Sequence, residues 1–177
     1  PLVFEVIDAQ RPSARGELEI ADTINGLLAR GAPVDFQITE ADWVDTGKME
    51  DTLLANRIAL EDLSPSIDPA ASLRDSSYEG IVRLDPDAVV ERSRLVGPVV
   101  IGRGAVVRDS EIGPYVSVGD GAVVVASRVE NAILMERARV ERCELLRDSM
   151  LGREARAVGL PAHASVTLGD HSAVALP

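Results

Sequence analysis

Two short acidic segments carry the residues best suited to chemistry. The segment Arg15–Ile20 (RGELEI) has two carboxylates just ahead of an apolar periodic stretch, and Trp43–Gly47 (WVDTG) has one between an extended and a helical pattern. An aspartate at a strand end, before a helix, can meet a cation or a metal-bound phosphate. The same residues also suit structural roles, Asp45 in a turn or cap and Glu17 and Glu19 as acids facing a helix dipole. The residues alone leave both interpretations open.

The elements that would position these acids mix helix and strand. Apolar residues at helical spacing predict a helix over 20–28, and Gly31 lies where such a helix ends. Strict alternation of apolar and polar residues predicts a strand over 34–38 with one buried face. A second helix is predicted from Met49 to Leu63, where acids suit its N-terminal end. Two prolines in Ser64–Pro69 then interrupt any regular element.

After this break, aliphatic residues recur every five or six positions, which neither a period of 2 nor one of 3.6 produces. These residues are Leu95, Ile101, Val107, Ile112, Val118, Val124, Val129, Leu134, Val140, Leu145 and Leu151. A triangular coil explains the spacing, because each side points one aliphatic residue inward and glycine helps the chain turn. Three sides make a coil of roughly eighteen residues, so about four coils are expected between Val82 and Leu151.

The predicted fold is therefore mainly β, a parallel β-helix of hexapeptide repeats. Its left-handed sense is taken from its resemblance to hexapeptide-repeat proteins. A β-sandwich is the alternative, but sandwiches need alternation and usually aromatic core residues, and only 3% of this chain is aromatic. Beyond the repeat, Val166–Leu168 and Ala173–Leu176 flank a polar turn, which predicts a hairpin or terminal strand that caps the open end of the coils.

Composition limits the classes of partner. The 177 residues carry a net charge of −11, which repels nucleic-acid phosphates and anionic lipids, so neither a nucleic-acid nor a membrane role is expected. No apolar run reaches the ~20 residues that cross a bilayer. Cys143 is the single cysteine, so it forms no internal disulfide, and we expect a buried thiol and a cytoplasmic protein.

Three segments resemble the glucose-1-phosphate thymidylyltransferases, namely Pro12–Ile20, Trp43–Gly47 and Leu53–Arg57. The resemblance is best to the long form of that family, which has a β-helical C-terminal extension. Val96–Gly102 and Leu168–Ser172 also resemble this form, though less specifically. The resemblance covers nearly the whole chain and implies that it is the C-terminal portion of a sugar-phosphate nucleotidyltransferase. It implies four segments: 1–65 as C-terminal elements of the nucleotidyltransferase domain, 66–80 as linker and first irregular coil, 81–152 as β-helix and 153–177 as capping tail.

The resemblance implies transfer of a nucleotidyl group, expected to be dTMP, from dTTP to glucose 1-phosphate with release of pyrophosphate. It also implies that Asp45 helps to hold the magnesium cofactor and that Glu17 contacts the sugar, and it assigns no residue here a catalytic role. Ala21 and Val44 depart from the family pattern, which weakens the substrate assignment more than the reaction class. The family's glycine-rich phosphate loop is not found between residues 1 and 69, so we expect half an active site and an inactive chain.

Other functions remain open. A hexapeptide acyltransferase uses a histidine base beside the coils, but Leu84–Leu151 contains none, and His163 and His171 lie beyond the repeat. Related pyrophosphorylases transfer adenylyl, guanylyl or uridylyl groups. A non-catalytic assembly module is the third class, since Val123–Val125 offers either an exposed aliphatic row for a homo-oligomer or a local bulge.

Overall fold

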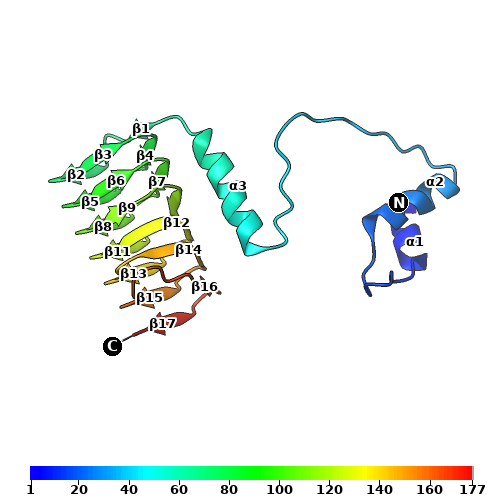
Figure 1. The fold of residues 1–177 in the computed structure, drawn as a ribbon. Helices are drawn as coiled ribbons and strands as arrows, with labels where there is room; N and C mark the ends of the chain where they lie inside the picture. Colours follow the sequence, from blue (N-terminus) through cyan, green and yellow to red (C-terminus); the bar gives the residue numbers. More distant parts are fainter. Residues whose placement is uncertain (177) are drawn as a thin grey trace. The chain divides into compact units, whose positions relative to one another are not determined.

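The chain folds into two compact units, Pro1–Asp42 and Trp43–Pro177. The computed structural model describes residues 1–176, and Figure 1 traces their elements. No helix in this part of the chain is long and apolar enough to span a bilayer.

The first unit is built from two short helices, α1 (Leu2–Ala9) and α2 (Ile20–Ala29). The predicted helix over 20–28 is confirmed, and Gly31 follows it with φ +71°. The helices approach closely at Gly26, where a β-carbon would lie 2.6 Å from Val6 Cγ1, so any larger residue would force the Val6 side chain to move. Val6 and Thr23 are the buried side chains of this unit. Most of its apolar surface is therefore uncovered.

The predicted strand over 34–38 is not formed. Residues 33–40 belong to no helix or strand and have no strand partner among the described residues, and Phe36 and Ile38 are 83% and 81% exposed. Alternation gives a chain one apolar face, but a strand exists only when another strand satisfies its backbone N–H and C=O groups. The apolar alternation is real, and its pairing partner is missing from residues 1–176.

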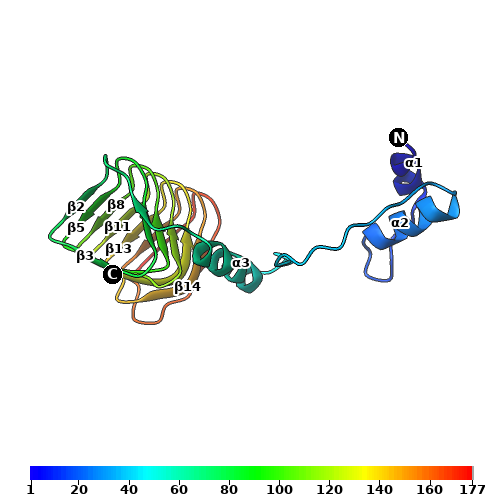
Figure 2. The same ribbon diagram turned by 90° about the horizontal axis from the view of Figure 1, so that it is seen from above.

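The second unit begins with α3 (Met49–Glu61) and continues into a parallel β-helix of about six turns, which confirms the predicted fold. Figure 2 shows its coils stacked one behind another. Every strand pair is parallel, and the strands form three faces. Face 1 contains β1 (Ser66–Ile67), β4 (Val82–Leu84), β7 (Val99–Ile101), β10 (Val116–Val118), the later parts of β12 (Arg128–Leu134) and β14 (Leu146–Leu151), and β16 (Thr167–Leu168). Face 2 contains β2 (Ser72–Arg74), β5 (Val89–Glu91), β8 (Val106–Arg108), β11 (Val123–Val125), β13 (Arg139–Glu141), β15 (Arg156–Val158) and β17 (Ala173–Ala175). Face 3 contains β3 (Ser77–Glu79), β6 (Arg94–Val96), β9 (Glu111–Ile112) and the first parts of β12 and β14.

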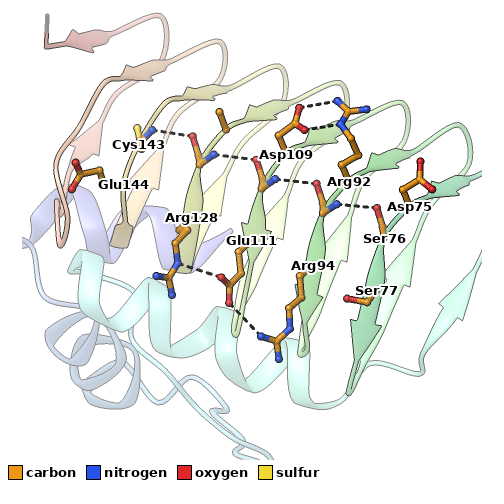
Figure 3. A pocket seen from close by; sticks show the side chains of 14 residues that line it. Asp75, Ser76, Ser77, Arg92, Arg94, Asp109, Glu111, Arg128, Cys143 and Glu144 are labelled. Carbon is orange, nitrogen blue, oxygen red and sulfur yellow. Dashed lines mark hydrogen bonds and ion pairs between the residues drawn. The ribbon is translucent and has the colours of Figure 1, made fainter.

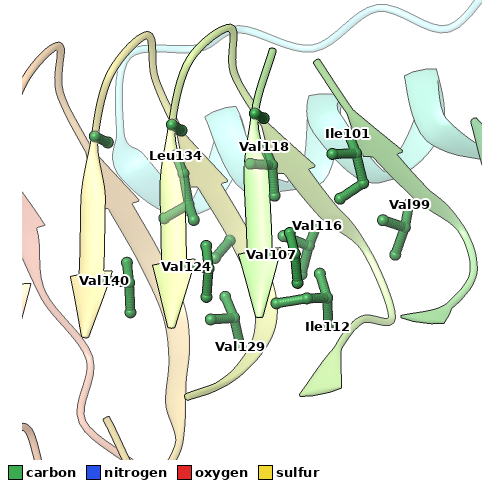
Figure 4. Close-up of a cluster of buried hydrophobic side chains, with 14 of the residues drawn as sticks. Val99, Ile101, Val107, Ile112, Val116, Val118, Val124, Val129, Leu134 and Val140 are labelled. Carbon is green, nitrogen blue, oxygen red and sulfur yellow. The ribbon is translucent and has the colours of Figure 1, made fainter. Parts of the chain in front are cut away.

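The interior of the β-helix is a column of aliphatic side chains. The predicted inward residues from Leu95 to Val140 are at most 1% exposed and project into the lumen from all three faces (Figure 4). The end of the series needs one correction, because Leu146, rather than Leu145, pairs with Val129 and takes the inward position. Burial of this column removes apolar area from water at about 25 cal/mol per Å², the main favourable term of the fold.

Each coil is shorter than three hexapeptides. Val99 pairs with Val116 and Val106 with Val123, a spacing of 17 residues. The missing residue lies between faces 2 and 3, where the inward residues Val107 and Ile112 are five apart. The 18-residue coil expected from the repeat is thus corrected to 17, and one coil is shorter still, because Val116 pairs with Ala132 and Val123 with Arg139, a spacing of 16 residues.

The coils also extend beyond the predicted range of 81–152. The segment 66–80, predicted as linker and irregular coil, contains β1, β2 and β3, which pair with β4, β5 and β6. The predicted capping tail 153–177 contains β15, β16 and β17 in the same parallel register. The hairpin prediction is therefore wrong and its terminal-strand alternative holds, because Leu168 and Val174 pack against the lumen as earlier aliphatic residues do.

Candidate functional site

Glu17 lies in a tight turn that precedes α2. The Ser13 amide donates to the Glu17 carbonyl at 2.8 Å, and Gly16 takes φ +78°, a left-handed conformation that glycine adopts without strain. The Glu17 side chain is exposed and has no hydrogen-bond partner among residues 1–176. The turn therefore fixes the backbone and leaves the carboxylate open to solvent.

Glu19 is held much more firmly than Glu17. Its carboxylate accepts hydrogen bonds from the Ser13 hydroxyl at 2.8 Å and from both Nε and Nη2 of Arg15 at 2.8–3.1 Å. The Arg15 hydrogen bonds, followed by the Ser13 bond, lower the pKa of Glu19. Both acids precede α2 rather than standing in its first turn, where Asp22 is the acidic residue. Glu19 is the N-cap residue of α2 and so stays at the positive end of the helix dipole, where it also pairs with Arg15, whereas Glu17 lies in the preceding turn.

A second polar contact ties this turn to α2. Thr23, which is 4% exposed, donates to Gln10 Oε1 at 2.8 Å, and Gln10 Nε2 donates to the Glu19 carbonyl at 2.7 Å. Sequence inspection missed Gln10 and Thr23, because neither belongs to an acidic motif. Their nine- and thirteen-residue separations from their partners become visible only in the fold.

Asp45 belongs to the second unit and lies in an extended segment ahead of α3. It is exposed, as are Thr46 and Gly47, and the N-cap of α3 is Lys48, with no side-chain hydrogen bond. The capping role considered for Asp45 is therefore not observed. Trp43, two residues earlier, is 86% exposed and does not pack on this segment.

Magnesium prefers six oxygen ligands and is often held by one or two carboxylates with phosphates and waters. The Asp45 carboxylate fits one such position. No group of three or more His, Cys, Asp or Glu side chains able to hold a metal occurs within the described residues. The described residues therefore do not form a complete magnesium site by themselves.

The helix that follows Asp45 is fixed to the β-helix by the motif Leu53–Arg57. Leu53 and Leu60 are buried, at 4% and 3% exposure. The Ser117 hydroxyl donates to Asn56 Oδ1 at 2.6 Å, and Arg57 Nε donates to Asn131 Oδ1 at 2.7 Å. This motif thus anchors the helix at the corner where β12 and β14 turn.

The same corner carries an aromatic contact. The Arg57 guanidinium lies 5.3 Å from the centre of the Tyr115 ring, a cation–π distance. The Tyr115 hydroxyl donates to Glu61 at 2.8 Å, and this hydrogen bond to the carboxylate raises the pKa of Tyr115. Residues separated by more than fifty positions therefore position the start of the second unit.

A groove of about 850 Å³ follows the corner between faces 2 and 3 (Figure 3). Its floor is a ladder of serines, in which each hydroxyl accepts the backbone N–H of the next coil at 3.0–3.1 Å and donates to a carbonyl two residues earlier. The ladder comprises Ser76, Ser93, Ser110 and Ser127 and ends at Cys143. Cys143 is 1% exposed, and burial raises the pKa of its thiol, so the expected buried thiol is confirmed. The serine hydroxyls of the ladder are thus engaged in hydrogen bonds to backbone groups. No histidine that could act as a general base lines this groove.

Both histidines lie at exposed positions on the later coils. His171, predicted to lie beyond the repeat, stands at a turn between β16 and β17, and its Nδ1 is 3.2 Å from Glu154. Glu154 also binds Arg137 Nη2 at 2.8 Å, and the Arg137 hydrogen bond is the main cause that lowers the pKa of Glu154. The acid beside His171 is therefore shared with an arginine.

No protein-family model matches the chain. Three curated relatives do. A low-salt glycan biosynthesis nucleotidyltransferase of Haloferax volcanii is 52% identical over 64 residues, or 36% of this chain and 18% of its own length. A glucose-1-phosphate thymidylyltransferase of Streptomyces antibioticus is 44% identical over 68 residues, or 38% of this chain and 19% of its own length.

One relative matches nearly the whole chain. A glucose-1-phosphate thymidylyltransferase of Streptomyces griseus is 37% identical over 175 residues, which cover 97% of this chain and 49% of that enzyme. The chain thus spans about half the length of this relative. Among solved structures, a perosamine N-acetyltransferase from Caulobacter crescentus aligns at 20% identity and TM-score 0.28, over 72% of this chain and 61% of that one.

Proposed function

We propose, because this chain is homologous to the glucose-1-phosphate thymidylyltransferases, that it is part of an enzyme that transfers a nucleotidyl group to a sugar 1-phosphate and releases pyrophosphate. The observation that carries this proposal is the match to the Streptomyces griseus enzyme at 37% identity over 97% of the chain. The names of two relatives supply the finer assignment, which is dTTP as donor and glucose 1-phosphate as acceptor.

In this proposal Glu17 and Asp45 have different tasks. The exposed Glu17 carboxylate accepts hydrogen bonds from sugar hydroxyls, whereas Glu19 is engaged by Arg15 and only shapes the turn. Asp45 supplies one ligand to magnesium, and the bound ion would neutralise phosphate charge. The remaining ligands come from substrate phosphates, water and a part of the enzyme outside this chain.

The exposed apolar side chains around these acids support an incomplete domain. Phe36, Ile38 and Trp43 are each more than 80% exposed, although such residues normally lie in cores or interfaces. We propose that another part of the enzyme covers the first unit and pairs with residues 34–38. The chain alone is then inactive.

The decisive experiment compares this chain with the longer protein that contains it. Each is incubated with magnesium, glucose 1-phosphate and dTTP, UTP, ATP or GTP, and released pyrophosphate is measured. We expect turnover with dTTP from the longer protein and none from the chain. Turnover by the isolated chain would contradict the half-site proposal, and absence of pyrophosphate with every triphosphate would contradict the reaction class.

Substitutions in the longer protein separate the two acids. Asp45→Asn should lower kcat about 100-fold or more, because a lost metal ligand removes several kcal/mol of transition-state stabilisation. Glu17→Gln should raise the KM for glucose 1-phosphate with a smaller effect on kcat. Asp42→Asn removes the same charge from an exposed neighbour and serves as control. Unchanged kinetics of Asp45→Asn would remove this residue from the site.

The two alternative functions predict different results from the same material. A hexapeptide acyltransferase would release free thiol from acetyl-CoA in the presence of an amino-sugar nucleotide, with no pyrophosphate. A non-catalytic assembly module would do neither, while still associating with other protein chains. The nucleotidyltransferase proposal expects pyrophosphate and no thiol.

We also propose that the earlier coils of face 2, at β5, β8 and β11, join copies of the chain and leave the later coils of this face free. Val124 is fully buried, while Val123 and Val125 both point outward and are half-buried, so no bulge forms. Val89 and Val106 continue this outward row on the preceding coils. Val106→Lys should shift the molar mass in light scattering towards the monomer. Val100→Lys on face 1 is the matched control, and a wild-type chain that is already monomeric would contradict the proposal.

A further inference from the structure

Charged side chains on the outside of the β-helix alternate in sign from coil to coil. On face 3, Arg94 lies 2.8 Å from Glu79 on one side and 3.8 Å from Glu111 on the other. On face 2, Arg108 lies 2.9 Å from Glu91. Opposite charges across neighbouring strands stabilise a sheet, and like charges directly opposite destabilise it.

One rung breaks this alternation. Arg139 of β13 and Arg156 of β15 are direct partners in the parallel register, and both are exposed on face 2. The outer neighbours in the same row are Val123 and Ala173, so neither arginine has an acid opposite it. Two guanidinium groups therefore project side by side from strands that lie ~4.8 Å apart.

Nearby acids already have partners. Glu154 binds Arg137 at 2.8 Å and His171 at 3.2 Å. Glu141 lies 3.3 Å from Arg139 Nη1 and 3.9 Å from Arg142. Arg156 has no ion pair within the described residues 1–176. The surrounding charges thus leave a positive excess at this rung.

The two arginines line a groove of about 640 Å³ on the later coils. Its lining residues are Gly121, Arg137, Arg139, Glu154, Arg156, His171, Ser172 and Ala173. Arg137 is paired with Glu136 and Glu154, and Arg139 lies 3.3 Å from Glu141, so the positive excess of this groove comes from Arg156, in a chain whose net charge is −11. A local positive groove on an acidic protein attracts small anions and concentrates them.

We propose that this groove is an anion site and that Arg139 and Arg156 together bind a phosphate group. A guanidinium presents a planar fork of donors that matches phosphate oxygens, and a phosphate has enough terminal oxygens to accept from two such forks at once. A doubly charged anion bound between the two arginines attracts both guanidinium groups and so offsets the repulsion between them. This site goes beyond the proposed nucleotidyl transfer and does not involve Glu17 or Asp45.

Calorimetric titration of the chain tests this site, with inorganic phosphate, glucose 1-phosphate and acetate as the probes. We expect both phosphates to bind and acetate not to bind at the same concentrations. Tighter binding of glucose 1-phosphate would identify a sugar phosphate as the source of the phosphate group, and equal or tighter binding of inorganic phosphate would identify the free ion. Arg139→Gln and Arg156→Gln should each weaken binding about tenfold, since a charged hydrogen-bond pair is lost.

Arg128→Gln removes the same charge from face 3 and should leave phosphate binding unchanged.

Arg156→Glu provides a second measurement, because it places an acid opposite Arg139 and so restores the alternation of charge. It should raise the thermal midpoint of the chain without phosphate and abolish the increase that phosphate gives to the wild type. No phosphate binding by the wild type, or equal binding by the glutamine variants, would overturn the proposal. A change of molar mass in these variants without phosphate binding would overturn it in favour of a protein interface. Because the readout needs no pyrophosphate release, its failure is distinct from failure of the transferase proposal.

Discussion

Single hydroxyl groups connect successive coils at the corner between faces 2 and 3. Ser110 is 8% exposed, and its Oγ accepts the Ser127 amide at 3.1 Å while donating to the Arg108 carbonyl at 2.6 Å. One short side chain therefore supplies the partner that the Ser127 N–H lacks in the backbone, and it adds a second donor to the Arg108 carbonyl, which also accepts the Ala126 N–H. This explains why serine, the smallest hydroxyl residue, recurs there every 17 positions.

Ser110→Ala tests the energetic value of this ladder. The substitution leaves the Ser127 N–H buried without a partner, whereas the Arg108 carbonyl keeps the Ala126 N–H at 3.0 Å, so the free energy of unfolding should fall by about 1–3 kcal/mol. Urea unfolding followed by circular dichroism provides the measurement. Ser77→Ala, at an exposed position one residue beyond the ladder, should change it by no more than ~0.5 kcal/mol. Equal effects of the two substitutions would contradict the role of the ladder.

At the scale of elements, α3 is held to the β-helix by one apolar stripe and a few polar contacts. Leu53 and Leu60 provide the buried contacts, and Arg57 and Asn56 hydrogen-bond to the corner residues. Isolated helices of this length are marginal in water, so the coils rather than the helix sequence keep it formed.

Leu53→Ala should therefore loosen α3 selectively. The lost burial and the cavity cost about 2–5 kcal/mol in a packed site, and the helix has few other anchors. Hydrogen exchange of the amides in 49–61 should become faster, while amides in the coils from 82 to 151 keep their protection. Leu54→Ala alters the adjacent leucine, which is 48% exposed, and should leave exchange unchanged. Uniformly faster exchange throughout the chain would contradict this local effect.

The elements also show what sequence patterns can predict. The aliphatic spacing predicted the β-helix, because each inward residue depends only on its own side of a coil. The prediction of a strand over 34–38 was wrong, because alternation describes a single strand and does not show whether a second strand pairs with it. The sequence did not predict the contacts among Gln10, Thr23 and Glu19 or the serine ladder, because these contacts also depend on partners that are distant in the sequence. Glu17 and Asp45 were singled out by resemblance, and their roles stay predictions.

At the scale of the whole molecule, three carboxyl groups make the free energy of unfolding depend on pH in the acidic range. The pKa values of Glu19, Asp109 and Glu154 are all lowered by hydrogen bonds from arginines. A lowered pKa in the folded state stabilises the protein above the ordinary value of the group, and this stabilisation is lost as the pH falls through the folded-state value. The chain should therefore lose stability as the pH falls below about 4.

Asp109→Asn should make this dependence shallower. The Arg92 hydrogen bond is the main cause of the lowered pKa of Asp109, and asparagine cannot titrate. Unfolding midpoints in urea between pH 6 and pH 3 provide the measurement. Asp87→Asn is the control, at another left-handed turn position and with no ion pair among the described residues. A steeper acid dependence in Asp109→Asn would contradict this assignment.

The constant parallel register has a consequence for how such a chain can change length. Strands one coil apart occupy equivalent places, at 17 residues in most coils and 16 from β10 to β12. Excising one complete coil would therefore bring two already compatible edges together and leave their contacts unchanged in kind. Each gain or loss would lengthen or shorten the prism by one strand spacing, ~4.8 Å. The distance between the two ends of the β-helix can therefore change only in steps of one strand spacing.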